Sequence, residues 1–231
     1  MDRDRLVLVQ HHRVGWPPRA ARYKRMFTTP ALLAFQVRLL RLAGYRFSTL
    51  HEAIGAHGRR AVVTFDDGYR DNAEAGAAVL GQLGIPATVF VVSSDVGRTQ
   101  LQWDESGDRL PADLMGWDDL RSLVDRGWEV GSHGHEHVHL ARRPPEEQRE
   151  IVCRGRDSIA RMLGAAPQSF AYPYGSFTDA TIDAVRCAGF HCAVTADGGA
   201  NGLRPDPFRL RRQPGGGRGL RHFAAAIRLL L

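Results

Sequence analysis

Two adjacent carboxylates follow an apolar stretch of the chain, at Asp66 and Asp67 in Thr64-Phe65-Asp66-Asp67-Gly68-Tyr69. Successive residues of a β-strand point to opposite faces, so two neighbouring Asp side chains share one site only where the strand ends. Gly68 permits the chain to turn at that point. Two carboxylates brought together in this way are suited to proton transfer and metal binding. The alternative is an Asp-Gly turn in which one carboxylate caps the following helix.

A second candidate site is a histidine cluster, Gly131-Ser132-His133-Gly134-His135-Glu136-His137-Val138-His139. His133 and His137 are four residues apart, so on a helical turn both imidazoles would reach one ion, and neutral imidazole is a good zinc ligand. His135 would point elsewhere. A polar surface loop is the alternative, but the cluster directly follows an apolar stretch, which favours metal binding at a strand end.

A third feature is the sharp turn predicted in Phe170-Ala171-Tyr172-Pro173-Tyr174-Gly175, where Pro173 and Gly175 bracket Tyr174. Such a turn exposes backbone N–H groups, which are suited to bind a developing oxyanion. A plain turn without a chemical role is the alternative.

Short apolar runs and amphipathic segments alternate along the chain and predict the elements that must position these residues. Expected strands cover 6–10, 61–65, 87–92, 128–131, 169–172, 191–195 and 208–212. Expected helices begin at Pro30 and stop at Gly44, then cover 72–83, 117–125, 146–163 and 179–188. This alternation favours a parallel sheet, and about seven units without a linker favour a closed barrel, so we expect one domain over residues 1–231. The unusual residues follow the strands, where a barrel builds its active face.

The composition is that of an ordinary globular domain, with 43% apolar and 24% charged residues. The net charge of +6 would favour anionic partners only weakly, because the basic residues form no long run, and we expect no nucleic-acid partner. The three cysteines show no Cys-x-x-Cys spacing, so we expect neither a disulfide framework nor a zinc knuckle. The apolar run near the N-terminus is too short for a signal peptide or a membrane span, which predicts a cytoplasmic protein.

Taken together, the three motifs resemble those of the polysaccharide deacetylases, the carbohydrate esterases that share the NodB homology domain. The resemblance extends from about His12 to Arg212. It implies a distorted (β/α)7 barrel, similar to a TIM barrel, and a divalent metal ion, with zinc favoured. It also implies roles for five residues: Asp66 as catalytic base, Asp67, His133 and His137 as metal ligands, and Tyr174 as donor of an oxyanion N–H.

The sequence departs from the common family pattern at two places. The family arginine that braces the catalytic aspartate is replaced by Ala171, and Arg209 and Arg211 are the candidate substitutes. The late Leu-x-His motif, whose histidine protonates the leaving amine, is absent. However, the segment Gln10-His11-His12-Arg13-Val14 resembles the early Tyr-His-Arg-Val motif of a family branch with permuted motif order, which implies that His12 is the general acid.

The resemblance implies a metal-dependent hydrolase that removes acetyl groups from N-acetylated amino sugars or polysaccharides, with carbohydrate as its partner. A barrel that binds glycans without turning them over is one alternative. A metal-dependent phosphoesterase is the other, although such enzymes often use two metals and more carboxylates than the motifs supply. The sequence leaves the identity of the sugar and the oligomeric state open.

Overall fold

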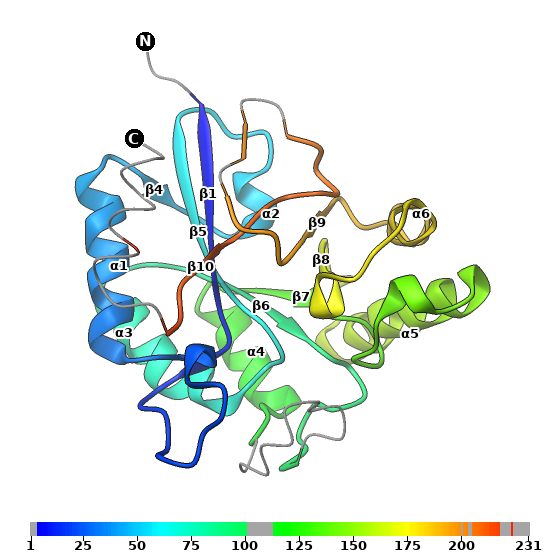
Figure 1. The fold of residues 1–231 in the computed structure, drawn as a ribbon, viewed down its shortest axis with the longest axis horizontal. Helices are drawn as coiled ribbons and strands as arrows, with labels where there is room; N and C mark the ends of the chain where they lie inside the picture. Colours follow the sequence, from blue (N-terminus) through cyan, green and yellow to red (C-terminus); the bar gives the residue numbers. More distant parts are fainter. Residues whose placement is uncertain (1–3, 101–112, 200, 203–204, 218–222, 224–231) are drawn as a thin grey trace.

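A computed structural model describes residues 4–100, 113–199, 201–202, 205–217 and 223. At its centre is a parallel sheet, seven strands of which follow the order β10-β1-β5-β6-β7-β8-β9 (Figure 1). Their bounds are β1 (Arg5–His11), β5 (Arg59–Phe65), β6 (Thr88–Val91), β7 (Glu129–Ser132), β8 (Ser169–Ala171), β9 (Cys192–Val194) and β10 (Gln213–Pro214). The short strand β4 (Arg46–Phe47) pairs with the first part of β5, whereas β6 pairs with its end. A separate ribbon joins β2 (Arg13–Val14) and β3 (Phe27–Thr28).

The segment 210–214 curls the sheet back on itself. Leu210 forms a parallel bridge to Val194 at the end of β9, and β10 pairs with Val9 and Gln10 of β1. The sheet therefore curls almost into a ring, and the predicted parallel, barrel-like sheet is confirmed. The prediction of a strand over 208–212 is wrong in its bounds. The N–H groups of Phe208 and Arg209 bond to Asp206 in a turn, and the strand β10 begins only at Gln213.

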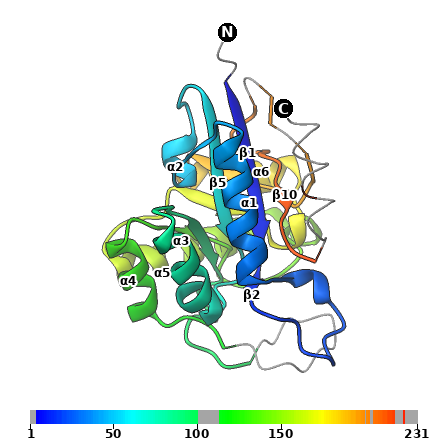
Figure 2. The ribbon, with the colours of Figure 1, turned by 90° about the vertical axis from the view of Figure 1, so that its left-hand side faces the viewer.

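Most helices cover the outside of the sheet, with α1 and α3 on one side and α5 and α6 on the other (Figures 1 and 2), whereas the short α2 packs against the buried cluster that contains Leu8, Val62 and Phe90. Their bounds are α1 (Pro30–Leu42), α2 (Leu50–Ala53), α3 (Ala77–Gln82), α4 (Trp117–Asp125), α5 (Pro145–Leu163) and α6 (Asp179–Cys187). The bounds of α4 are those predicted. The helix expected over 72–83 instead begins as a π-helical turn, η2 (Asn72–Gly76). No helix of the described residues is long and apolar enough to cross a membrane.

The interior of the ring is filled by side chains. Leu8, Val62, Phe90, Val194 and Leu210 come from different parts of the sheet and form one buried cluster. Val7 and Val9, the neighbours of Leu8 in β1, face outward. There they pack against residues of α1 and of the segment that follows it. Because strand residues alternate in this way, the inward positions that follow the apolar cluster toward the strand ends are the ones that can build a site.

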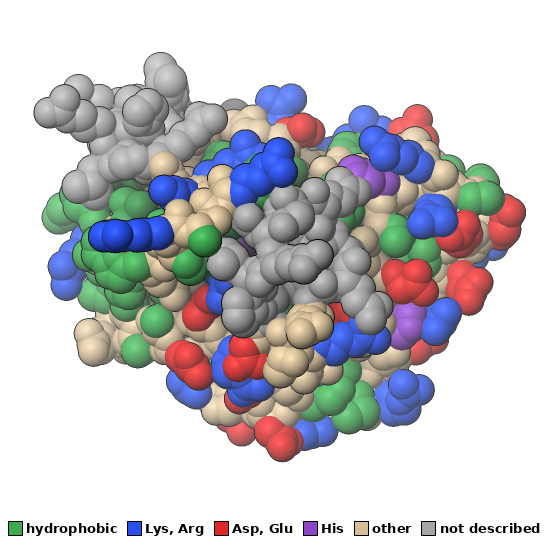
Figure 3. All heavy atoms as spheres, turned by 60° about the horizontal axis from the view of Figure 1, so that its bottom comes forward, with side chains coloured by type: hydrophobic (Ala, Val, Ile, Leu, Met, Phe, Trp, Pro, Cys, Tyr) green, Lys and Arg blue, Asp and Glu red, His purple; other side chains and the backbone are tan. Residues whose placement is uncertain are grey.

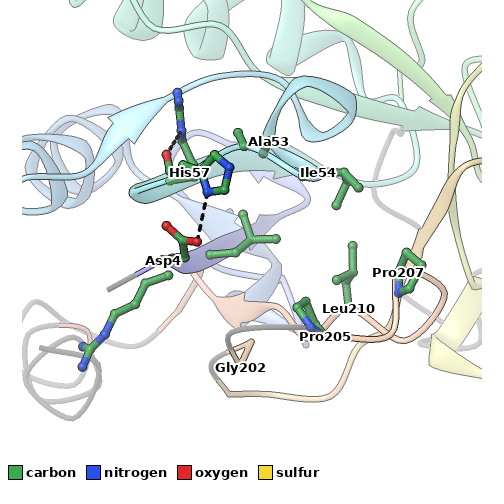
Figure 4. Close-up of a pocket in the computed structure, with 13 residues that line it drawn as sticks. Asp4, Ala53, Ile54, His57, Gly202, Pro205, Pro207 and Leu210 are labelled. Atoms are coloured by element: carbon green, nitrogen blue, oxygen red, sulfur yellow. Dashed lines mark hydrogen bonds and ion pairs between the residues drawn. The ribbon is translucent and has the colours of Figure 1, made fainter. Parts of the chain in front are cut away.

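A cavity of about 410 Å³ lies at the end of the ring where strands β1 and β5 begin (Figure 4). Its wall contains the apolar residues Leu6, Ile54 and Leu210, and its rim carries the exposed pair of His57 and Asp4, 3.2 Å apart. The carboxylates and histidines singled out from the sequence lie at the other end of the strands. This cavity is therefore separate from the candidate site.

Candidate active site

Asp66 and Asp67 share one site because the backbone leaves the strand conformation between them. Asp66 still follows the sheet, its N–H donating to the carbonyl of His11 at 3.0 Å. Asp67 then takes a left-handed conformation with φ 71°, and Gly68 follows with φ 77°. A positive φ is uncommon for a residue other than glycine and is typical of functional sites. The break removes the alternation that would send one carboxylate to the opposite face.

Asp67, His133 and His137 come together although they are far apart in sequence. The Oδ1 atom of Asp67 lies 3.5 Å from Nε2 of His133 and 3.5 Å from Nε2 of His137. All three side chains are buried, and their candidate ligand atoms lie within 4.8 Å of one another. His133 directly follows β7, and its Nδ1 lies 2.7 Å from the carbonyl of Ala171, to which it donates. When the ring is neutral, this bond leaves the lone pair on Nε2, the atom that faces Asp67.

The segment that carries the histidines is a loop and not the helical turn expected from their spacing. Gly134 has φ 86°, and its carbonyl accepts from Ser93 N–H, while His135 N–H donates to Ile151. These hydrogen bonds tie the loop to neighbouring segments and replace the i to i−4 bonds of a helix. His135 points elsewhere, as expected, and contacts Ser93 and Arg154.

The three buried donors fit a divalent cation. Two imidazoles and one carboxylate are a common ligand set for zinc and related ions. Burial lowers the pKa of His137 to about 3, which keeps its imidazole neutral and able to coordinate. Burial lowers the pKa of His133, but in the charged ring Nε2 carries a proton that it donates to Asp67. This hydrogen bond and the charges of both aspartates outweigh the effect of burial and raise the pKa of His133. The surroundings therefore favour positive charge, which a bound cation would supply.

Asp66 is held by a buried arginine. Arg212 donates from Nη1 to Oδ1 of Asp66 at 2.6 Å and from Nη2 to Oδ2 at 2.8 Å, while Nε2 of Gln10 donates to Oδ2 at 2.8 Å. Burial alone would raise the pKa of the Asp66 carboxyl, but the charge of Arg212, followed by smaller effects of His133 and His12, holds it well below its usual range. Asp66 is therefore ionised at neutral pH.

Arg212 corrects the expectation that Arg209 or Arg211 replaces the family arginine. Arg209 is half-exposed and pairs with Asp179 and Asp206, and Arg211 is also exposed. Arg212 is fully buried. It lies two residues after Leu210, whose side chain faces the interior of the ring, so an extended backbone turns both side chains to the same face. This alternation along the sequence could have identified Arg212, and not Arg209 or Arg211, as the arginine that faces the interior. Gln10, one residue before the two histidines, was also missed.

His12 and not His11 faces the carboxylates. The Nε2 atom of His12 lies 3.9 Å from Oδ2 of Asp66, and its side chain is 30% exposed. His11 is buried on the other side, with Nδ1 2.9 Å from the hydroxyl of Thr28 and its ring against Gly215, where a Cβ would lie 2.1 Å from Cε1. Burial lowers the pKa of His11 to about 3. The alternation of β1 thus separates the two neighbouring rings.

Tyr174 lies in the turn after β8, beside the histidine loop. Its backbone has φ 57° and ψ 11°, and besides Asp67 it is the only residue other than glycine with positive φ in the described part of the chain. Its ring centroid lies 4.3 Å from that of His137 and 4.1 Å from that of His139. Asp66, Asp67, His133, His137, His12 and Tyr174 thus border one region. Histidines and both signs of charge are interspersed on the surface at this end of the molecule (Figure 3).

Residues 54–193 match the family model of polysaccharide deacetylases. The chain belongs to the polysaccharide deacetylase family. It is 24% identical over 151 residues to YxkH of Bacillus subtilis (strain 168), a protein named for the same family, covering 65% of this chain and 50% of YxkH. It is 25% identical over 71 residues to the peptidoglycan deacetylase of Helicobacter pylori (strain ATCC 700392 / 26695), covering 31% and 24% of the two chains. The chain thus spans at most about half the length of these curated relatives.

Solved structures share the fold of this deacetylase-family chain over nearly its whole length. IcaB from Ammonifex degensii is 27% identical with a TM-score of 0.77, covering 96% of this chain and 94% of IcaB. A de-N-acetylase from Aggregatibacter actinomycetemcomitans is 21% identical with a TM-score of 0.81, covering 99% and 100%. These likenesses support the distorted (β/α)7 barrel predicted from the sequence.

The buried pair of Arg212 and Asp66 generates a stability prediction. Arg212→Met should lower the free energy of unfolding by about 3–5 kcal/mol at pH 7, because it leaves a carboxylate buried without its cation. Arg209→Met and Arg211→Met are matched controls that should change it by no more than about 0.5 kcal/mol. Urea unfolding measures all three. If Arg211→Met and Arg212→Met lowered the free energy of unfolding equally, Arg212 would not be the arginine that compensates the buried charge of Asp66.

The same experiment has a defined pH dependence. The pKa of Asp66 is depressed in the folded protein, so its stabilisation is complete above the unfolded value of about 3.9 and is lost as the pH falls through the folded value. Without Arg212, burial raises the pKa of Asp66, and protonation then relieves the variant. The difference in stability between wild type and Arg212→Met should therefore narrow as the pH falls from neutral and should continue to narrow below about pH 4. A difference that stays constant down to pH 3 would show that Arg212 acts without the charge of Asp66.

Proposed function

We propose that this chain is a metal-dependent hydrolase that removes the acetyl group from the nitrogen of N-acetylated amino sugars, free or within a polysaccharide. The observation that carries the proposal is the buried set of Asp67, His133 and His137 with the ionised Asp66 beside it. Membership of the polysaccharide deacetylase family supports the substrate class, and the shared fold of a de-N-acetylase supports the amide bond. We take residues 1–231 as one deacetylase domain, since the sheet uses residues from both ends of the chain.

Asp67, His133 and His137 would hold the metal ion, for which we propose zinc. A divalent ion held by this set would polarise the acetyl carbonyl and would lower the pKa of water toward about 7. Three protein ligands suit a catalytic role, since structural zinc sites usually use four. Among the described residues this is the one group of three or more His, Cys, Asp or Glu side chains able to share an ion, which favours a one-metal site over the two-metal site of many phosphoesterases.

Asp66 accepts the proton of the attacking water in this proposal. Its carboxylate is ionised, and the paired hydrogen bonds from Arg212 fix the plane of the group. Gln10 holds Oδ2 from another direction. The base is thereby oriented before the substrate arrives, which removes part of the entropic cost of the reaction.

His12 and Tyr174 complete the proposed chemistry. His12, partly exposed and close to Asp66, donates a proton to the departing sugar nitrogen. The backbone N–H of Tyr174 donates to the oxyanion that develops on the acetyl oxygen. Each of these groups comes from a different strand end, which is the usual construction of a barrel active site.

Acetate release from a panel of N-acetylated sugars, with and without a chelator, tests the proposed function. Asp66→Asn should lower turnover by about 10²–10⁴-fold while the protein keeps its metal, because only the proton acceptor is removed. His133→Ala should lose both activity and metal. Metal content after gel filtration separates the two variants. Equal metal loss in both variants, or no acetate from any substrate with the metal-loaded wild type, would overturn the proposal.

A second experiment tests the assignment of the general acid. His12→Ala should lower the turnover rate by about 10²–10⁴-fold, in line with the loss of general acid catalysis. His57→Ala is the control, because this exposed histidine lies at the opposite end of the barrel. Steady-state acetate release measures both variants. Wild-type activity in His12→Ala would move the role to another group.

A further inference from the structure

Tyr174 holds a backbone conformation that tyrosine rarely adopts. The turn around it is closed by the N–H of Gly175 donating to the carbonyl of Tyr172 at 2.9 Å, and Tyr174 and Gly175 have φ of 57° and 64°. Positions with positive φ in such turns usually hold glycine or asparagine, because a Cβ makes the conformation costly. The surrounding structure must therefore compensate for this strain, and the side chain of Tyr174 is one place where it can do so.

The phenol ring of Tyr174 packs between two imidazoles of the histidine loop. It stacks on His139, with ring centroids 4.1 Å apart and planes inclined by 16°, and it meets His137 edge-on at 4.3 Å and 64°. A further contact fastens the same two segments, because the N–H of Ala141 donates to Ser176 Oγ at 3.3 Å. The turn after β8 is thereby attached to the loop after β7.

We propose that His139 is a positioning residue for the oxyanion site. Its imidazole stacks on the ring of Tyr174 and holds that residue in the left-handed conformation, so that the backbone N–H of Tyr174 keeps its orientation toward the reacting carbonyl. His139 acts through Tyr174 and does not itself touch the reacting atoms. This inference rests on the proposed deacetylase function, in which the Tyr174 N–H binds the oxyanion.

The variants His139→Ala and His139→Phe separate this role from a general structural one. Loss of the stacked ring should lower kcat by about 3–10-fold in His139→Ala, with KM and metal content unchanged, because the oxyanion contact forms mainly in the transition state. His139→Phe should retain most of the activity, since a flat ring can still stack. His191→Ala is the matched control, a surface histidine whose ring packs against His51 elsewhere on the molecule.

The backbone argument has its own test at position 174. Tyr174→Gly should be more active than Tyr174→Ala, because glycine adopts positive φ without strain whereas alanine keeps the strain and loses the ring. Adding His139→Ala to Tyr174→Gly should cause no further loss. If the ring of Tyr174 acted only by contacting substrate, the glycine and alanine variants would be equally impaired, and the proposal would be wrong.

A double-mutant cycle in urea unfolding keeps this test independent of the reaction. Wild type, His139→Ala, Tyr174→Ala and the double variant should show a favourable coupling between the two rings. Absence of coupling would refute the contact itself, whatever the chain hydrolyses. If the wild type releases acetate and the two rings are coupled, but His139→Ala leaves kcat unchanged, the positioning role is refuted. A wild type that releases no acetate from N-acetylated sugars would refute the proposed function, and with it the oxyanion role given to Tyr174.

Discussion

Burial of two neighbouring carboxylates at one strand end is the constraint on which the rest of the site depends. A buried anion is costly unless opposite charge and hydrogen bonds surround it. Asp66 is compensated by the guanidinium of Arg212 and the amide of Gln10. Asp67 faces two imidazoles instead, which leaves it as the carboxylate available to a cation. The different compensation of two adjacent residues is what gives them different chemical roles in the proposed reaction.

Backbone strain is concentrated where this arrangement is built. In the described residues, Asp67 and Tyr174 alone among residues other than glycine have positive φ, and they border the same site from different strand ends. At Asp67 the strained turn brings the second carboxylate to the side of the first. At Tyr174 the strained turn after β8 lies against His137 and His139 of the histidine loop. The surrounding fold supplies rigid strand ends that can hold both conformations.

Much of the fold follows from local patterns that the sequence displays directly. Apolar runs between glycine stops predicted the major strands and helices. The resemblance to the polysaccharide deacetylases implied that Asp67, His133 and His137 share one ion, and the three side chains do lie together. Features set by tertiary contacts could not be predicted in this way. The histidine segment has helical spacing but is a loop, because its backbone bonds to neighbouring segments. Arg212 was missed because its role depends on how segment 210–214 closes the ring between β9 and β1.

The proposed chemistry depends on a single ion bound by the buried side chains of Asp67, His133 and His137. The most direct measurement is the number of zinc ions retained per chain when metal-stripped protein is dialysed against zinc, compared between wild type and Asp67→Ala. We expect one ion per wild-type chain and none in the variant. No zinc retained by the wild type, two ions per chain, or an unchanged ion count in Asp67→Ala would contradict it.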